Sequence, residues 1–124
     1  MAMTIAEATI IAAGTAIAPS GTESAPVPAG IGQTVGPFAD YAASFAYRIT
    51  NSNGALGAAA TIVFYASAGG RLYEVDRVTG DTGAGSISHG TIPYPSGFAY
   101  ATAKVFGNQT NPVTVEVYLE RQVP

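Results

Sequence analysis

Hydrophobic and polar residues alternate along most of the chain, and a period of two residues indicates β-strands with one buried face. Residues 41–50 show the pattern clearly, with Phe45, Tyr47 and Ile49 on one side and smaller or more polar residues on the other. Residues 60–66 are rich in β-branched and aromatic side chains, which predicts a strand buried on both faces. Residues 71–78 alternate again, and 86–92 predict a further short strand.

The last third of the chain predicts a hairpin. Residues 98–106 alternate, residues 107–112 have the Gly, Asn and Pro content of a turn, and residues 113–120 alternate again. In that final segment Val113, Val115, Val117 and Leu119 share one face. One apolar and one polar face is typical of an antiparallel sheet.

The N-terminal third is less regular. Residues 4–18 mix Ala with β-branched residues, and Gly14 and the sequence Pro19-Ser20-Gly21 would stop a helix, so we expect one or two extended pieces, with a short helix as the alternative. Residues 21–36 contain two prolines and four glycines. We therefore expect an extended N-terminal arm over 1–36 and a single β-sandwich core over 37–124. In total, seven to eight short strands predict an all-β antiparallel sandwich or jelly-roll-like barrel.

Composition narrows the possible functions. The 124 residues fit one domain, and the absence of Cys excludes disulfides and thiolate metal sites. Only 10% of residues are charged, against a usual share of about 25%. A net charge of −3 provides no basic face for nucleic acid. We also expect no membrane span and no secretory signal, and hence synthesis in a cytoplasm. So little charge suggests that copies of the chain or a larger assembly cover part of the surface, although plain adequate solubility is the alternative.

Few residues suggest chemistry. His89 is the only histidine, and the neighbouring Ser88 would point to the opposite face of a strand, so we expect a surface residue and not a catalytic one. Glu74 and Asp76, two apart, would project from one strand face, with Asp81 in the glycine-rich loop that follows. Such carboxylates could hold Ca²⁺ or act as a glycosidase pair, but a solvated face paired with arginines is the simpler interpretation. We predict no catalytic residue, cofactor or metal.

Tyrosine is abundant, with seven in the chain. Tyr94 lies between two prolines and is the best candidate for an exposed ring, while Tyr100 and Tyr73 lie on predicted strands. Exposed tyrosines can stack on sugars or anchor a protein interface. We therefore name Tyr94, Tyr100 and Tyr73 as a possible interaction surface.

Residues 106–117, with the sequence Phe-Gly-Asn-Gln-Thr-Asn-Pro-Val-Thr-Val-Glu-Val, resemble the final hairpins of small structural proteins of tailed-bacteriophage virions. The opening Ala16-Ile17-Ala18-Pro19-Ser20-Gly21-Thr22 is similar in character. The resemblance covers about a third of the chain and consists of general hairpin chemistry. It implies a capsid decoration (cement) protein that forms a homo-oligomer, with a trimer favoured. The implied partners are the major capsid protein or other virion proteins, and the protein is expected to bind neither nucleic acid nor membrane.

Three other functions stay open at this point. The chain could be a phage tail or fibre-associated protein, or a carbohydrate-binding or adhesin module that uses Tyr73, Tyr94 or Tyr100 as a stacking platform. A small hydrolase built on Glu74 and Asp76 or on His89 is the third alternative. The expected location is the virion.

Overall fold

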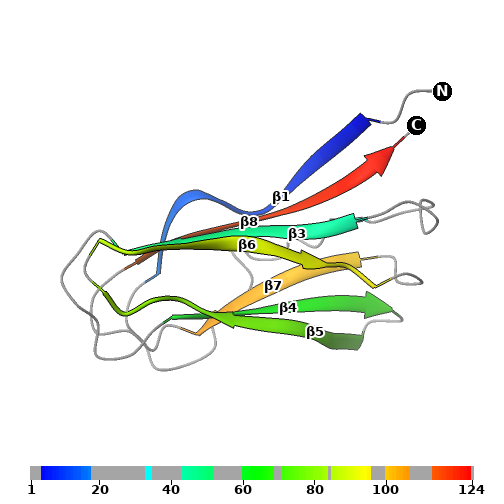
Figure 1. The fold of residues 1–124 in the computed structure, drawn as a ribbon. Coiled ribbons are helices and arrows are strands. Elements are labelled where there is room, and N and C mark those ends of the chain that lie inside the picture. The colour runs from blue at the N-terminus through cyan, green and yellow to red at the C-terminus, as the bar shows by residue number, and fades with distance from the viewer. Residues whose placement is uncertain are drawn as a thin grey trace.

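Two antiparallel four-stranded sheets stack face to face (Figure 1). The computed structural model describes residues 4–17, 33–34, 43–51, 60–68, 71–83, 85–95, 100–106 and 113–123. The strands within these ranges are, in chain order, β1 (Thr4–Ile17), β2 (Gln33–Thr34), β3 (Ala43–Thr50), β4 (Thr61–Ala68), β5 (Arg71–Thr79), β6 (Ile87–Pro93), β7 (Tyr100–Phe106) and β8 (Val113–Val123).

The strand order identifies the type of sandwich. One sheet has the order β1-β8-β3-β6 and the other β2-β7-β4-β5. Apart from β4 and β5, which pair with each other, consecutive strands lie in different sheets. This alternation is the double Greek key of a jelly roll. The prediction of an all-β antiparallel sandwich with seven to eight strands is confirmed.

The predicted final hairpin is wrong. β7 pairs with β4 and β2, whereas β8 pairs with β1 and β3 in the other sheet. An alternating pattern shows which face of a strand is buried but not which strand lies beside it. The six residues between β7 and β8 are enough to cross between two sheets that stack about 10 Å apart. The hairpin that carried the phage resemblance is therefore not formed.

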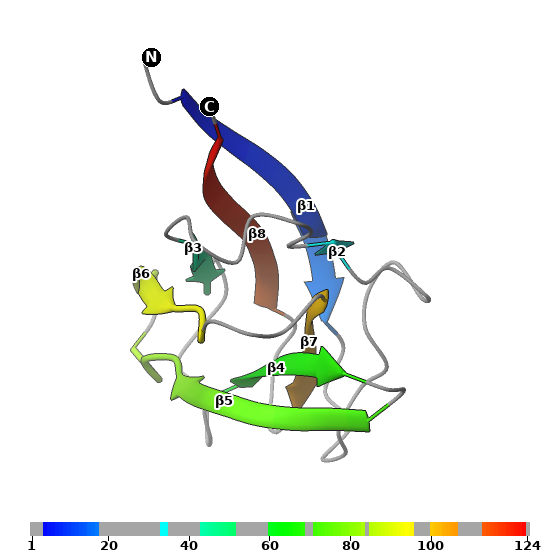
Figure 2. The ribbon, with the colours of Figure 1, turned by 90° about the vertical axis from the view of Figure 1, so that its right-hand side faces the viewer.

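The first strand belongs to the sandwich. β1 pairs along its length with β8, and its side chains Ile10, Ile11 and Ile17 are buried in the core. Residues 4–17 are extended, as predicted, but they are part of the fold and not an arm outside it. The paired strands β1 and β8 reach beyond the other strands at the end where both termini lie (Figure 2). Within the predicted connector 21–36, only β2 is among the described residues.

The core lies between the sheets and is aromatic at its centre. Phe45 of β3 and Phe64 of β4 come from opposite sheets, and their ring centroids are 4.9 Å apart. The predicted apolar face of β8 is confirmed, because Val113, Val115, Val117 and Leu119 are all buried. Ile62, Val63 and Phe64 are completely buried, so β4 is covered on both faces as predicted.

A buried amide fixes the crossing from β5 to β6. Asn51, which follows β3, is 1% exposed. Its side-chain Nδ2 donates to the carbonyl of Gly83 at 2.9 Å, and its backbone N–H donates to the carbonyl of Ser86 at 2.9 Å. The loop between β5 and β6 is thereby attached to the end of β3, which places β6 beside that strand.

Candidate functional site

The tyrosines predicted to form an interaction surface lie in different environments. Tyr73 lies on the edge strand β5 and is 46% exposed. Tyr94 follows β6 and is half-buried, because its ring packs edge-on against Phe45. Its backbone N–H donates to the carbonyl of Ala43 at 2.9 Å. Burial raises the pKa of Tyr94 to about 12. The expectation of an exposed ring at Tyr94 therefore fails. The side chain of Tyr100 lies outside the described residues.

The carboxylates of Glu74 and Asp76 do not share one face of β5. Asp76 pairs with Phe64, and Glu74 pairs with the next residue of β4, Tyr65, so Val75 is an extra residue in a β-bulge. Phe64 and Tyr65 point to opposite faces of their sheet, and so do the residues opposite them. The grouping on which a Ca²⁺ site or a glycosidase pair was considered is absent at this position.

The same bulge brings Glu74 and Arg77 together. At a spacing of three residues they would face opposite sides of a regular strand. Here the Arg77 guanidinium donates to both carboxylate oxygens of Glu74, from Nε at 3.1 Å and from Nη2 at 2.5 Å. This hydrogen bonding lowers the pKa of Glu74. Among the described residues, no three His or acidic side chains gather as metal ligands, and no helix there is long and apolar enough to cross a bilayer.

His89 lies on the outer face of the other sheet. It is exposed on β6 directly opposite Arg48 of β3. Ser88 is opposite the buried Ile49, so the two neighbours face different sides, as predicted. The Ser88 hydroxyl accepts a hydrogen bond from the backbone N–H of Asp81 at 3.0 Å. Ser88 therefore stabilises the loop between β5 and β6.

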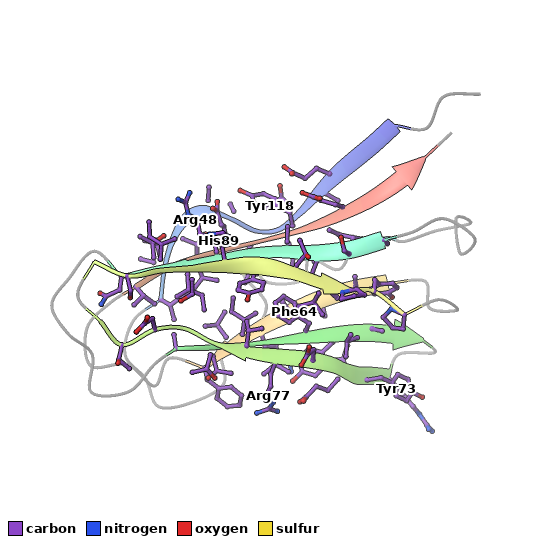
Figure 3. All side chains as sticks on the ribbon, viewed as in Figure 1. Arg48, Phe64, Tyr73, Arg77, His89 and Tyr118 are labelled. Atoms are coloured by element: carbon purple, nitrogen blue, oxygen red, sulfur yellow. The ribbon has the colours of Figure 1, made fainter. Side chains whose placement is uncertain are left out.

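The outer face of the β1-β8-β3-β6 sheet carries a shallow hollow around Arg48. It has a volume of about 410 Å³, and the small side chain of Ala46 leaves room at its floor. Arg48, His89 and Tyr118 all project from this sheet away from the other one (Figure 3). The full lining consists of Ala46, Tyr47, Arg48, His89, Gly90, Thr91, Glu116 and Tyr118.

One row of polar side chains crosses three strands beside this hollow. Glu116 of β8, Arg48 of β3 and His89 of β6 are direct cross-strand neighbours. The Arg48 Nη1 and the Glu116 Oε1 are 4.0 Å apart, at the limit of an ion pair. The Arg48 side chain is 52% exposed and Glu116 21%. A pair at this distance with a half-exposed arginine contributes little to stability.

An irregularity in β1 lies beside Glu116, one of the residues that line the hollow. Ile11 pairs with Val117 and Thr15 with Val115, so three residues of β1 lie opposite the single residue Glu116. One of the three, Gly14, has a φ of +79°, a conformation that favours glycine. The Thr15 hydroxyl donates to the carbonyl of Ala12 at 2.6 Å and closes the irregular segment.

Tyr118 is held by this segment. Its hydroxyl donates to the Glu116 Oε2 at 3.0 Å and receives a backbone hydrogen bond from Ala13. Burial, the bond to Glu116 and the charge of Glu7 raise the pKa of Tyr118. A second hollow of about 230 Å³ lies on the other side of the Arg48–Glu116 pair and is lined by Ala13, Gly14, Arg48, Thr50, Thr114, Val115 and Glu116. We call the two hollows and the pair between them the Arg48 face.

On the outer face of the opposite sheet, long side chains cover the position of Val63 on β4. Val63 points outward there, yet it is completely buried. It lies between Arg77 and Lys104 on the neighbouring strands. The Arg77 guanidinium lies 6.0 Å from the ring centroid of Phe106, and the Lys104 Nζ 5.6 Å from that of Tyr65. Long side chains lying over rings cover the apolar surface.

The sequence did not single out the Arg48 face. The alternation of residues 113–120 places Glu116 and Tyr118 on the polar side of that strand, but nothing in the pattern placed Arg48 beside them. That neighbourhood depends on the order β8-β3-β6, which joins strands distant in the chain. One signal was present, because Arg48 is the only charged residue in the stretch 41–50.

Comparison with known proteins supports the fold. No protein-family model matches the chain, and no curated protein matches its sequence. Among solved structures, it is similar to a chain in the structure of infectious bursal disease virus, Gx strain, with a TM-score of 0.52 and 10% identity. The match covers 98% of this chain and 32% of that one, so the chain spans about a third of the viral protein's length. At this identity the likeness establishes a shared β-sandwich fold.

Proposed function

We propose that the chain is a non-enzymatic structural protein of a virion, and specifically a decoration protein that binds and stabilises a phage head. The observation that carries this proposal is the strand order β1-β8-β3-β6 and β2-β7-β4-β5. This is the jelly roll, an architecture of viral capsid proteins, and the similar solved chain comes from a virus.

The surface and the core both suit a protein that functions by binding other proteins. With 10% charged residues, much of the exterior is uncharged and can be buried against another protein at small desolvation cost. The core is filled by side chains from both sheets and is centred on Phe45 and Phe64, which makes the subunit a stiff element. A decoration protein stabilises a shell by adding interface area, and a specific interface takes about 800 Å² from each partner.

The proposed partners are further copies of the chain, in a trimer, and the major capsid protein or other virion proteins. Neither nucleic acid nor membrane is among them. The proposed location is the outside of the virion, after synthesis in the host cytoplasm.

Heads that lack this protein provide the direct test. The heads come from a deletion mutant of the virus whose genome encodes this chain. They are mixed with the purified chain, and the bound protein is measured by co-sedimentation. We expect saturable binding and a higher temperature of DNA release than for bare heads. Binding to isolated tails but not to heads would support a tail or fibre protein instead. No binding to either particle would overturn the virion assignment.

A further inference from the structure

We propose that the larger hollow of the Arg48 face binds an uncharged sugar ring. This inference goes beyond a structural role in a virion and does not depend on it. It rests on the shape of the hollow, on the kinds of polar group at its edge and on their balance of charge.

The shape suits a small ligand presented from outside. A volume of about 410 Å³ lies within the range of small-molecule sites. The floor at Ala46 is small, and the walls come from Tyr118 and Glu116 on one side and from His89 and Thr91 on the other. Because the hollow opens directly to the surface, it can receive one ring of a longer glycan without enclosing it.

The polar groups match vicinal hydroxyls. Each sugar hydroxyl both donates and accepts, so it is bound best where donors and acceptors are neighbours. Arg48 supplies a planar fork of donors, and the Glu116 Oε1 supplies an acceptor 4.0 Å away. This separation is longer than a hydrogen bond, so a hydroxyl placed above the pair can accept from the Arg48 guanidinium and donate to the Glu116 carboxylate without breaking a strong contact. The ring of Tyr118 and the imidazole of His89 add flat surfaces at the edge.

The charge balance favours an uncharged ligand. The positive charge of Arg48 and the negative charge of Glu116 lie side by side, so an anion attracted by the first is repelled by the second. The same holds for a cation with the signs reversed. A neutral polyhydroxyl ring gains from both groups and is penalised by neither.

The site is also organised in advance. Tyr118 is fixed by Glu116 through its hydroxyl and by the backbone of Ala13, and the irregular segment of β1 positions that backbone. Arg48, Glu116 and His89 stand on three paired strands. The backbones that carry these groups are fixed before a ligand binds, so binding orders side chains only. Since the hollow is shallow, we expect millimolar affinity for a single ring and tighter binding when many copies are displayed.

The test is a titration of the ¹⁵N-labelled chain with single sugars, followed by NMR. The probes are the methyl glycosides of glucose, galactose, mannose and N-acetylglucosamine, with N-acetylneuraminic acid as a charged probe and glycerol as a non-ring control. We expect at least one neutral glycoside to shift the amide signals around Arg48, His89 and Glu116, and expect no comparable shifts with N-acetylneuraminic acid or glycerol.

Three variants locate the effect. Arg48→Gln removes the donor fork and should weaken binding about tenfold, because hydrogen bonds to charged groups are strong. Ala46→Leu fills the floor and keeps every polar group, so it should abolish binding while the fold is retained. Arg77→Gln is the matched control, since Arg77 is also 52% exposed and paired with a glutamate but lies on the opposite sheet; it should bind as the unchanged chain does.

The outcomes separate the two proposals. The sugar site is overturned when no neutral glycoside shifts these amide signals at a glycoside concentration about 100-fold above a 1 mM Kd. It is also overturned when Ala46→Leu and Arg77→Gln respond alike to the glycoside. Stronger binding of N-acetylneuraminic acid than of any neutral glycoside also overturns it. Head binding by Ala46→Leu that equals that of the unchanged chain shows that particle contact does not use the hollow. Loss of sugar binding alone then leaves the virion role intact.

Discussion

Asn51 shows how much a single buried polar side chain can determine. Its amide and its backbone both bond to the loop between β5 and β6, through Gly83 and Ser86. In Asn51→Ala this hydrogen bond is lost, which should cost about 0.5–1.5 kcal/mol of unfolding free energy. Urea unfolding should show a lower midpoint with an unchanged slope. Thr82→Ala, on the exposed part of the same loop, is the control, and an equal loss there would show that the Asn51 contacts are not special.

Tyr94 makes stability depend on pH at the alkaline end. Its pKa is raised by burial to about 12, above the value of about 10 in an unfolded chain. The folded state therefore holds the phenol proton more tightly, and its advantage is complete below pH 10 and lost as the pH rises toward 12. We expect the urea midpoint of unfolding to decrease as the pH is raised from 10 to 12, and we expect a smaller decrease in Tyr94→Phe. An equally steep decline in both proteins would contradict this.

At the scale of the element, β1 tests whether residues 4–17 are a detachable arm or a strand of the sandwich. Ile11 is fully buried, and its strand pairs with β8. Ile11→Ala should therefore destabilise the chain by about 2–5 kcal/mol, as expected for truncation in a packed core. Thermal unfolding measures this, with Ala12→Ser on the exposed neighbour as the control. A detachable arm would tolerate both changes, so equal stability would contradict the structure.

The alternating pattern predicted the strands well and their partners poorly. It identified the buried faces of β3 and β8 because burial of one face imposes a period of two on the sequence. It gave no register, so the bulge at Val75 that separates Glu74 from Asp76 was invisible. It also suggested a hairpin for β7 and β8, which cross between sheets. The Arg48 face was missed for the same reason, since strand order created it.

At the scale of the whole molecule, the uncharged exterior is the feature that most requires an explanation. Among large hydrophobic residues with described surroundings, Leu72, Tyr73 and Ile87 are between 44% and 48% exposed. Leu72 and Tyr73 lie on β5 and Ile87 lies on β6, and these are the edge strands of the two sheets. Edges with apolar side chains are surfaces that proteins usually protect or use for association.

Self-association would cover these edges, and the trimer proposed from the resemblance to decoration proteins gives a mass prediction. Light scattering after size-exclusion chromatography should give about three times the 12.5 kDa of the chain. Because contacts between uncharged surfaces are not screened by salt, the mass should be the same at about 50 mM and at 500 mM NaCl. Ile87→Lys places a charge on an apolar edge residue and should shift the population toward monomer, whereas Thr91→Lys, exposed on the same strand, tests whether charge alone is responsible. A 12.5 kDa particle at high protein concentration would contradict self-association and leave contact with a different protein as the use of this surface.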